Sequence, residues 1–225
     1  MRTYLVTGGA GFIGSNYIHY MFRKYDNEIR IINVDVLTYA GNLENLKDIE
    51  NRDNYTFIKA DICDREAIEK IFAENDIDRV VHFAAESHVD RSIRNPEVFV
   101  QTNVMGTAVM LNAAKKAWEL PDGTFKADKK FLHVSTDEVY GSLPDDDERK
   151  AHINEDLITY VEDRKGHDRR YAIAPDKIKS EIGWYPETMF KDGIRLTIAW
   201  FFEHEEWMKN VTSGDYQKYY SEMYK

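Results

Sequence analysis

The sequence predicts an α/β fold with a doubly wound parallel sheet, and three observations lead to this class. Over the first 140 residues, short runs rich in β-branched side chains alternate with longer helical stretches, which is the pattern of parallel strands joined by crossover helices. Each short run is continuous rather than alternating in hydrophobicity, as a sheet covered on both faces requires. A glycine-rich segment directly follows the first run.

Five strands and several helices are expected from these patterns. The strands cover residues 3–7, 29–34, 55–59, 79–83 and 130–135. The clearest helix start is Asn95-Pro96, a capping side chain followed by proline at the first helical position, and this helix is expected to continue to Trp118.

The composition of the sequence changes after Gly141. A charged stretch at 144–150 is expected to be a linker or an exposed loop. Beyond it we expect a strand at 157–161, a polar loop at 162–170, a short helix at 175–182, and a longer helix with apolar residues at helical spacing, Phe190, Ile194, Ile198 and Phe201.

Composition excludes several classes of protein. The chain has 225 residues, 43% of them hydrophobic, and a formal net charge of −10, so neither a disordered chain nor a nucleic-acid-binding protein is expected. No apolar run reaches the roughly 20 residues of a membrane span, so no membrane partner is expected. The single cysteine, Cys63, excludes a disulfide framework and a cysteine-cluster metal site, and we predict no metal. Met1 leads straight into a strand-like run without a signal segment, which favours a cytoplasmic location.

The strongest motif is the segment TGGAGFIG at residues 7–14, where a strand runs through glycines into a helix. Gly8, Gly11 and Gly14 permit a tight turn and a close approach of the backbone to a pyrophosphate, whose charge the free N–H groups of the helix would face. Asp35 lies 21 residues after Gly14 at the end of the second strand, where its carboxylate would bind ribose hydroxyls and repel a 2′-phosphate. These features predict a Rossmann-like site for NAD rather than NADP, in preference to a glycine turn without a ligand.

Two further strand ends point to the same crevice. Asp61 and Ile62 follow the third strand, where a carboxylate could bind the adenine amino group, and Ala84 and Ala85 follow the fourth, where small residues leave room for a dinucleotide. The alternatives are a helix cap for Asp61 and simple packing for the two alanines.

Four segments together resemble the extended short-chain dehydrogenase/reductases, and most closely their dTDP-glucose 4,6-dehydratases: TGGAGFIG at 7–14, HFAAESHVDRS at 82–92, NVMGT at 103–107 and STDEVYG at 135–141. The resemblance implies tightly held NAD and a closed redox cycle in which hydride leaves C4 of the sugar, water is lost across C5 and C6, and hydride returns to C6. It also places Phe12, Ile13 and Thr102 among the cofactor contacts.

The resemblance assigns the chemistry to the segment after the fifth strand. Thr136 would hydrogen-bond the C4 oxygen, Asp137 would act as the acid and Glu138 as the base, because elimination needs both. The alternative is a polar turn after a buried strand. Ser87, His88, Arg164 and Arg169 are the expected contacts to the nucleotide sugar, since guanidinium groups suit a diphosphate, although loop residues of these types are often only solvated.

The resemblance divides the chain into three parts: an NAD-binding Rossmann domain at 1–142, a linker or junction at 143–156, and a small, truncated C-terminal region at 157–225 that binds the nucleotide sugar. A homodimer through the helix that starts at Pro96 is the expected assembly.

One element of the family is missing from its place. The family carries Tyr-x-x-x-Lys on a helix after the fifth strand, whereas here the pattern occurs only by chance, at Tyr20–Lys24 and Tyr55–Lys59. A long segment is therefore expected to be absent near residues 143–155. Three explanations are open: the sequence joins pieces of a longer chain, the chain carries a deletion, or the protein is a degenerate binding module. The alternative functions are a related UDP-sugar epimerase or decarboxylase, and a non-catalytic NAD-binding protein.

Overall fold

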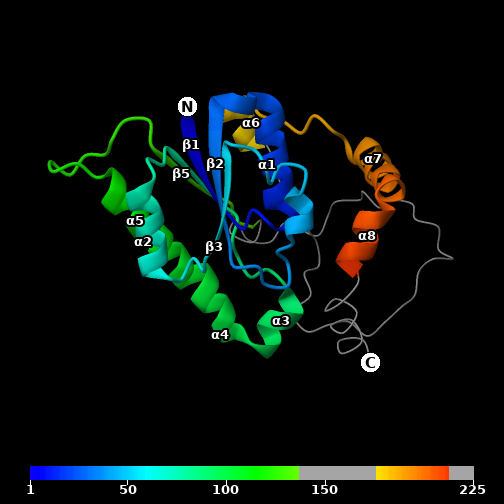
Figure 1. Cartoon of the computed structure of the whole chain (residues 1–225), viewed down its shortest axis with the longest axis horizontal. Helices are drawn as coiled ribbons and strands as arrows, with labels where there is room; N and C mark the ends of the chain where they lie inside the picture. The colour runs from blue at the N-terminus through cyan, green and yellow to red at the C-terminus, as the bar shows by residue number, and fades with distance from the viewer. Residues whose placement is uncertain (137–175, 213–225) are drawn as a thin grey trace. The chain divides into compact units, whose positions relative to one another are not determined.

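The computed structural model describes residues 1–136 and 176–212, with side chains up to residue 209. Two compact units are present, Met1–Val134 with Arg195–Lys225, and Ser135–Ile194. The first contains a five-stranded sheet in the order β3-β2-β1-β4-β5, in which every described pairing is parallel (Figure 1). Its strands are β1 (Arg2–Thr7), β2 (Ile29–Asp35), β3 (Tyr55–Lys59), β4 (Arg79–His82) and β5 (Lys130–His133). The predicted fold class is confirmed.

Helices cover both faces of this sheet. Helix α1 (Phe12–Tyr25) packs on one face, in a core built around Val6, Ile18 and Ile31 that includes Leu46 of the short η2 (Leu43–Leu46). Helices α2 (Arg65–Glu74) and α5 (Thr107–Trp118) pack together on the other face, over Leu5 and Val80. Successive residues of β1 point to opposite faces, so Leu5 and Val6, which are adjacent in the sequence, enter different cores.

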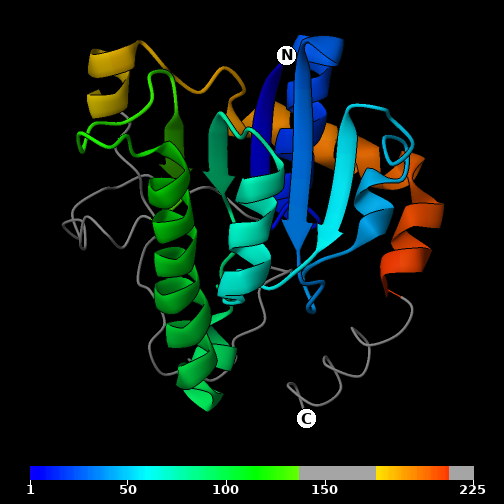
Figure 2. The same cartoon turned by 60° about the vertical axis from the view of Figure 1, so that its left-hand side comes forward.

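The chain between β4 and α5 departs from a single regular helix. A short α3 (Val89–Arg94) precedes α4 (Pro96–Phe99), and the π-helical segment η3 (Val100–Gly106) then joins α4 to α5, so that they follow one another as one long rod (Figure 2). The predicted helix from Pro96 to Trp118 is correct in extent, but the sequence pattern did not predict the π-helical turn within it. The predicted cap is wrong in one respect, because the Asn95 side chain makes no capping hydrogen bond.

The fifth strand is the edge of the described sheet and is shorter than predicted. β5 ends at His133, two residues before the predicted end, and β4 ends at His82, one residue early. The side chains of Leu132 and Val134 are 56% and 38% exposed. An exposed apolar edge here agrees with the expectation that elements which normally follow this strand are missing.

The C-terminal helices follow the sequence pattern. The predicted helices at 175–182 and around Phe190–Phe201 are confirmed as α6 (Asp176–Ile182) and α7 (Phe190–Glu203), and α8 (Glu205–Thr212) follows. The short η1 (Asp26–Glu28) completes the described elements. The strand predicted at 157–161 and the polar loop at 162–170 lie outside the described residues.

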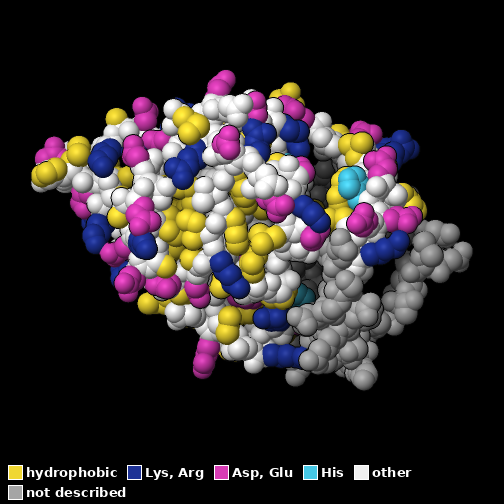
Figure 3. Space-filling view, viewed as in Figure 1, with side chains coloured by type: hydrophobic (Ala, Val, Ile, Leu, Met, Phe, Trp, Pro, Cys, Tyr) yellow, Lys and Arg dark blue, Asp and Glu magenta, His cyan; other side chains and the backbone are white. Residues whose placement is uncertain are grey.

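Hydrophobic side chains also gather on the surface of the sheet unit, over the face that carries β3 and α2 (Figure 3). None of the helices described is both long enough and apolar enough to span a bilayer.

Candidate functional site

The glycine turn after β1 has the geometry that the sequence predicts. Gly8 adopts φ +68°, and a Cβ placed on it would lie 2.7 Å from the backbone nitrogen of Ala84. A Cβ on Gly14 would overlap the carbonyl oxygen of Gly8. The two glycines thus let the turn approach both the loop after β4 and the first turn of α1, which no other residue type permits.

The N-terminus of α1 is open toward this turn. Its N-cap, Gly11, has no side chain to cap the helix, so the first amides of the helix are available to a ligand and carry the positive end of the helix dipole. Phe12 and Ile13, at the start of the same turn, are 79% and 62% exposed. This arrangement fits the diphosphate of a dinucleotide.

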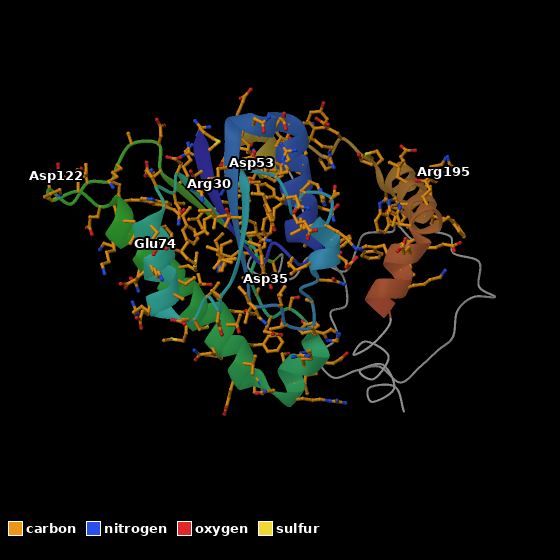
Figure 4. The ribbon with its side chains drawn as sticks, in the orientation of Figure 1. Arg30, Asp35, Asp53, Glu74, Asp122 and Arg195 are labelled. Atoms are coloured by element: carbon orange, nitrogen blue, oxygen red, sulfur yellow. The ribbon has the colours of Figure 1, made fainter. Side chains whose placement is uncertain are left out.

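Asp35 lies at the C-terminal end of β2 (Figure 4) and is only 9% exposed. Its Oδ2 accepts a hydrogen bond from the Ala10 amide at 3.0 Å, and its Oδ1 accepts one from the Leu37 amide at 2.8 Å. The carboxylate is therefore tied to the glycine turn, and each oxygen keeps a further lone pair for a ribose hydroxyl. These residues fit NAD.

Replacing Asp35 with asparagine is expected to lower NAD affinity by about tenfold and to narrow the preference for NAD over NADP. The amide offers one acceptor instead of two and no charge, and a hydrogen bond to a charged group contributes roughly 1.5–3 kcal/mol. Titration of both dinucleotides measures the effect. Asp53→Asn is the matched control, since it removes the same charge from an exposed loop that leads into the other end of the sheet (Figure 4). Equal affinities for Asp35→Asn and the wild type would show that the carboxylate does not bind the ribose.

The residues after β3 and on η3 are only partly arranged for binding. The Asp61 side chain is exposed, and its Oδ1 accepts a hydrogen bond from the Cys63 amide at 2.8 Å. It is not a helix cap, because Asp64 caps α2 through the Ala67 amide. Ile62 is a core residue packed beside Gly106, and Thr102 is half-buried on η3. Their contacts to adenine or ribose stay predictions.

The loop after β4 lies beside the glycine turn. The Ala84 amide donates to Thr7 Oγ1 at 3.3 Å, while Ala85 and Ser87 are exposed and His88 is half-buried at the N-cap of α3. Thr136 is exposed beyond the end of β5. Asp137, Glu138, Arg164 and Arg169 lie outside the described residues, so their roles remain predictions.

Sequence reasoning missed His82, which joins three elements beneath the site. Its Nδ1 lies 2.6 Å from Thr7 Oγ1 and its Nε2 lies 3.1 Å from Thr107 Oγ1. The Thr7 hydroxyl is buried and its oxygen accepts from the Ala84 amide, so we assign its hydrogen to Nδ1, 2.6 Å away, and the ring proton to Nε2, which then donates to Thr107 Oγ1. Burial, together with the neighbouring His133, lowers the pKa of His82 to about 4.

This shift predicts that the protein loses stability in acid. In the unfolded chain, His82 becomes protonated below its ordinary pKa of 6.5, whereas in the folded state it stays neutral down to about pH 4. The free energy of unfolding therefore falls as the pH is lowered between these two values. The expected loss between pH 7 and pH 4.5 is about 2 to 3 kcal/mol.

Urea unfolding of the wild type and of His82→Gln at both pH values measures that loss, and the variant should show a smaller pH dependence. An NMR titration of the wild-type imidazole is a second measurement. A His82 pKa near 6.5 would contradict the prediction.

A second missed feature is a pair of hydrogen bonds by which Asn103 brackets the backbone of Glu86. The Glu86 amide donates to Asn103 Oδ1 and the Asn103 amide group donates back to the Glu86 carbonyl oxygen, both at 2.8 Å. The Glu86 side chain is buried, and its Oε2 accepts no hydrogen bond from the described residues. The segment 82–92 contains the glutamate, but nothing in a sequence shows that such a carboxylate is buried.

Comparison with known proteins places the chain in a family. The family model for GDP-mannose 4,6-dehydratase matches residues 5–156. The dTDP-glucose 4,6-dehydratase of Shigella flexneri is 32% identical over 356 residues, spanning 98% of both chains. The chain belongs to the dTDP-glucose 4,6-dehydratase family. The resemblance stated from the motifs is thereby confirmed.

Solved structures of dTDP-glucose 4,6-dehydratases agree with this membership. The enzyme from Bacillus anthracis, crystallised with NAD, matches with a TM-score of 0.53 and 40% identity over 72% of this chain, but over only 45% of its own length. A double mutant of the enzyme from Streptomyces venezuelae, also with NAD bound, matches with a TM-score of 0.55 and 40% identity over 64% of this chain and 42% of its own.

The same comparisons show how much of the family this chain lacks. The alignment with the Shigella flexneri dehydratase runs over 356 positions, whereas this chain has 225 residues. At least 131 positions of that alignment therefore have no residue of this chain. A long missing segment agrees with the absence of the Tyr-x-x-x-Lys element, and its place near residues 143–155 stays a prediction.

Proposed function

We propose that this protein catalyses the NAD-dependent dehydration of dTDP-glucose to the 4-keto-6-deoxy sugar. The observation that carries the proposal is the adjacent pair Asp137 and Glu138, which follows β5 in the sequence of a chain whose relatives are dTDP-glucose 4,6-dehydratases. Elimination of water needs an acid and a base, and two neighbouring carboxyl groups can supply both.

The chain's own residues divide the work between binding and proton transfer. The open N-terminus of α1 and Asp35 would hold NAD, which accepts a hydride from the sugar and returns it. Thr136 would hydrogen-bond the C4 oxygen, Glu138 would remove the C5 proton, and Asp137 would give a proton to the departing C6 hydroxyl. Ser87, His88, Arg164 and Arg169 would bind the sugar and its diphosphate.

We also propose a cytoplasmic homodimer. On the helix that starts at Pro96, Val100 and Val104 are 58% and 59% exposed, and an exposed apolar stripe on a helix favours a partner surface. Size-exclusion chromatography with light scattering measures the assembly.

One observation favours a second function. No Tyr-x-x-x-Lys element stands after the fifth strand, so the usual base for the C4 hydroxyl proton is missing, and a chain without it would bind NAD but not turn over. A related UDP-sugar epimerase or decarboxylase is the weaker alternative, because these reactions have no use for the carboxyl pair.

Incubation of the purified protein with dTDP-glucose tests the proposal. The 4-keto product absorbs in alkali, so conversion is read directly, and UDP-sugars serve as competing substrates. Conversion of dTDP-glucose supports the dehydratase, whereas bound NAD without any conversion supports the non-catalytic protein. Intact mass spectrometry of the same sample should give 26.4 kDa; a larger mass would show that the assayed protein carries a further segment.

A further inference from the structure

Two loops of the sheet unit meet across the end of β1. The strand order places β1 between β2 and β4, so a contact between the loop after β2 and the loop after β4 crosses the position where the glycine turn begins. Arg91, on helix α3 at the end of the second loop, lies over the ring of Tyr39 from the first, with its Cζ 4.1 Å from the ring centroid. The ring of His88 lies edge-on to Tyr39, with centroids 6.3 Å apart.

The Tyr39 side of this contact is fixed to the glycine turn. The Asn42 amide donates to the Ala10 carbonyl oxygen at 3.0 Å, and a Cβ on Gly11 would lie 3.8 Å from the Ala40 carbonyl oxygen. Leu37 adopts φ +57° and donates its amide to Asp35. The loop is therefore held close to the place where a diphosphate would bind.

The Arg91 side is fixed by Glu86. The backbone of Glu86 is bracketed by Asn103, as described above, and its buried carboxylate lies 3.8 Å from Arg91 Nε. The Glu86 Oε2 atom accepts no hydrogen bond within the described part of the chain, and a buried carboxylate attracts a nearby cation because little water screens it. Glu86 thus orients the guanidinium toward Tyr39.

We propose that Tyr39 and Arg91 form a clasp across the glycine turn that slows the release of the bound dinucleotide, with Glu86 as the positioning residue; the proposal rests on the proposed binding of NAD. Tyr39 is 50% exposed and the Arg91 side chain is 36% exposed, as expected of the outer side of a closed site. An exposed cation–π pair is worth about two- to fivefold in a rate or an equilibrium.

A double-mutant cycle tests the clasp. Tyr39→Leu, Arg91→Gln and the double variant are loaded with NADH, and its release is followed by fluorescence after mixing with excess NAD. Each single variant should release NADH about two to five times faster than the wild type, and the double variant no faster than either single one. In the protein without dinucleotide, amide hydrogen exchange at residues 36–42 and 86–91 should also increase in the variants.

Three matched controls are available. Tyr39→Phe keeps the ring face and should release NADH at the wild-type rate. Tyr20→Leu changes a tyrosine that is 47% exposed on α1 and lies near Lys24, and Arg94→Gln removes the same charge from the exposed end of α3. Neither should alter the rate.

The outcomes separate the clasp from its alternatives. Additive effects of the two single variants would overturn it, because they would mean that Arg91 contacts the diphosphate independently of Tyr39. Unchanged rates, or no binding of NADH at all, would also overturn it. Coupled effects on NADH release in a protein that does not convert dTDP-glucose would support the clasp and refute only the dehydratase.

Discussion

Gly8→Ala is expected to lower the affinity for NAD by about 100-fold or more. At φ +68° the new Cβ would lie 2.7 Å from the Ala84 nitrogen and 2.8 Å from its Cα, and these backbone atoms cannot turn aside as a flexible side chain could. The turn must shift, and the amides at the start of α1 shift with it. Loss of one or two hydrogen bonds to an anionic diphosphate, at roughly 1.5–3 kcal/mol each, accounts for this fall.

The same substitution should lower the free energy of unfolding by about 2 to 5 kcal/mol, from left-handed strain and overpacking together. Gly123→Ala is the matched control, since Gly123 adopts φ +81° with nothing within 4 Å of its Cβ position. It should cost only the strain of about 1 to 2 kcal/mol and leave NAD binding unchanged. Calorimetric titration and urea unfolding measure both quantities. Wild-type affinity in Gly8→Ala would show that the turn does not bind the diphosphate.

The sheet was predictable because each strand carries its signal locally. The runs at residues 29–34 and 79–83 place apolar residues on both sheet faces, since both faces are covered, and their bounds agree with β2 and β4 to within one residue. The glycine turn was predictable for a similar reason. Its backbone demands are met by residue types that stand next to one another in the chain.

The parts that escaped prediction depend on residues far apart in the sequence. His82 contacts Thr7, 75 residues away, and Arg91 on α3 contacts Tyr39 in the loop after β2. The π-helical turn at Val100–Gly106 was not recognisable from the spacing of apolar residues. One extra residue in a helical turn shifts the apolar face slightly but keeps a helical spacing on either side. Such features need the fold before they can be seen.

The edge at β5 connects the fold with the question of activity. Apolar Leu132 lies 56% exposed there, and the alignment with the Shigella flexneri dehydratase includes at least 131 positions that have no residue of this chain. The residues predicted to bind NAD belong to the part that is present, since Gly8, the start of α1 and Asp35 all lie between the end of β1 and the end of β2. Turnover depends in addition on whether the remaining carboxyl groups can act without the missing tyrosine and lysine.

Glu138→Gln and Asp137→Asn should each lower the rate of dTDP-glucose dehydration by about 10²- to 10⁴-fold, the usual contribution of a positioned acid or base. Glutamine cannot accept the C5 proton, and asparagine cannot protonate the departing C6 hydroxyl, while both keep the size of the original side chain. NAD binding should not change, because neither carboxyl group belongs to the glycine turn or to the ribose contact. The alkaline absorbance of the 4-keto product measures the rate.

The two substitutions should also differ in whether the C5 proton is still removed. Without the base, exchange of the C5 hydrogen with deuterated water should stop, whereas without the acid the base can still remove that proton and exchange should persist while elimination fails. Asp146→Asn and Glu148→Gln are the matched controls, since they make the same chemical changes in the charged stretch about ten residues further along, and both should dehydrate at the wild-type rate. Wild-type turnover in Glu138→Gln would refute its assignment as the base, and exchange lost in Asp137→Asn but kept in Glu138→Gln would reverse the two roles.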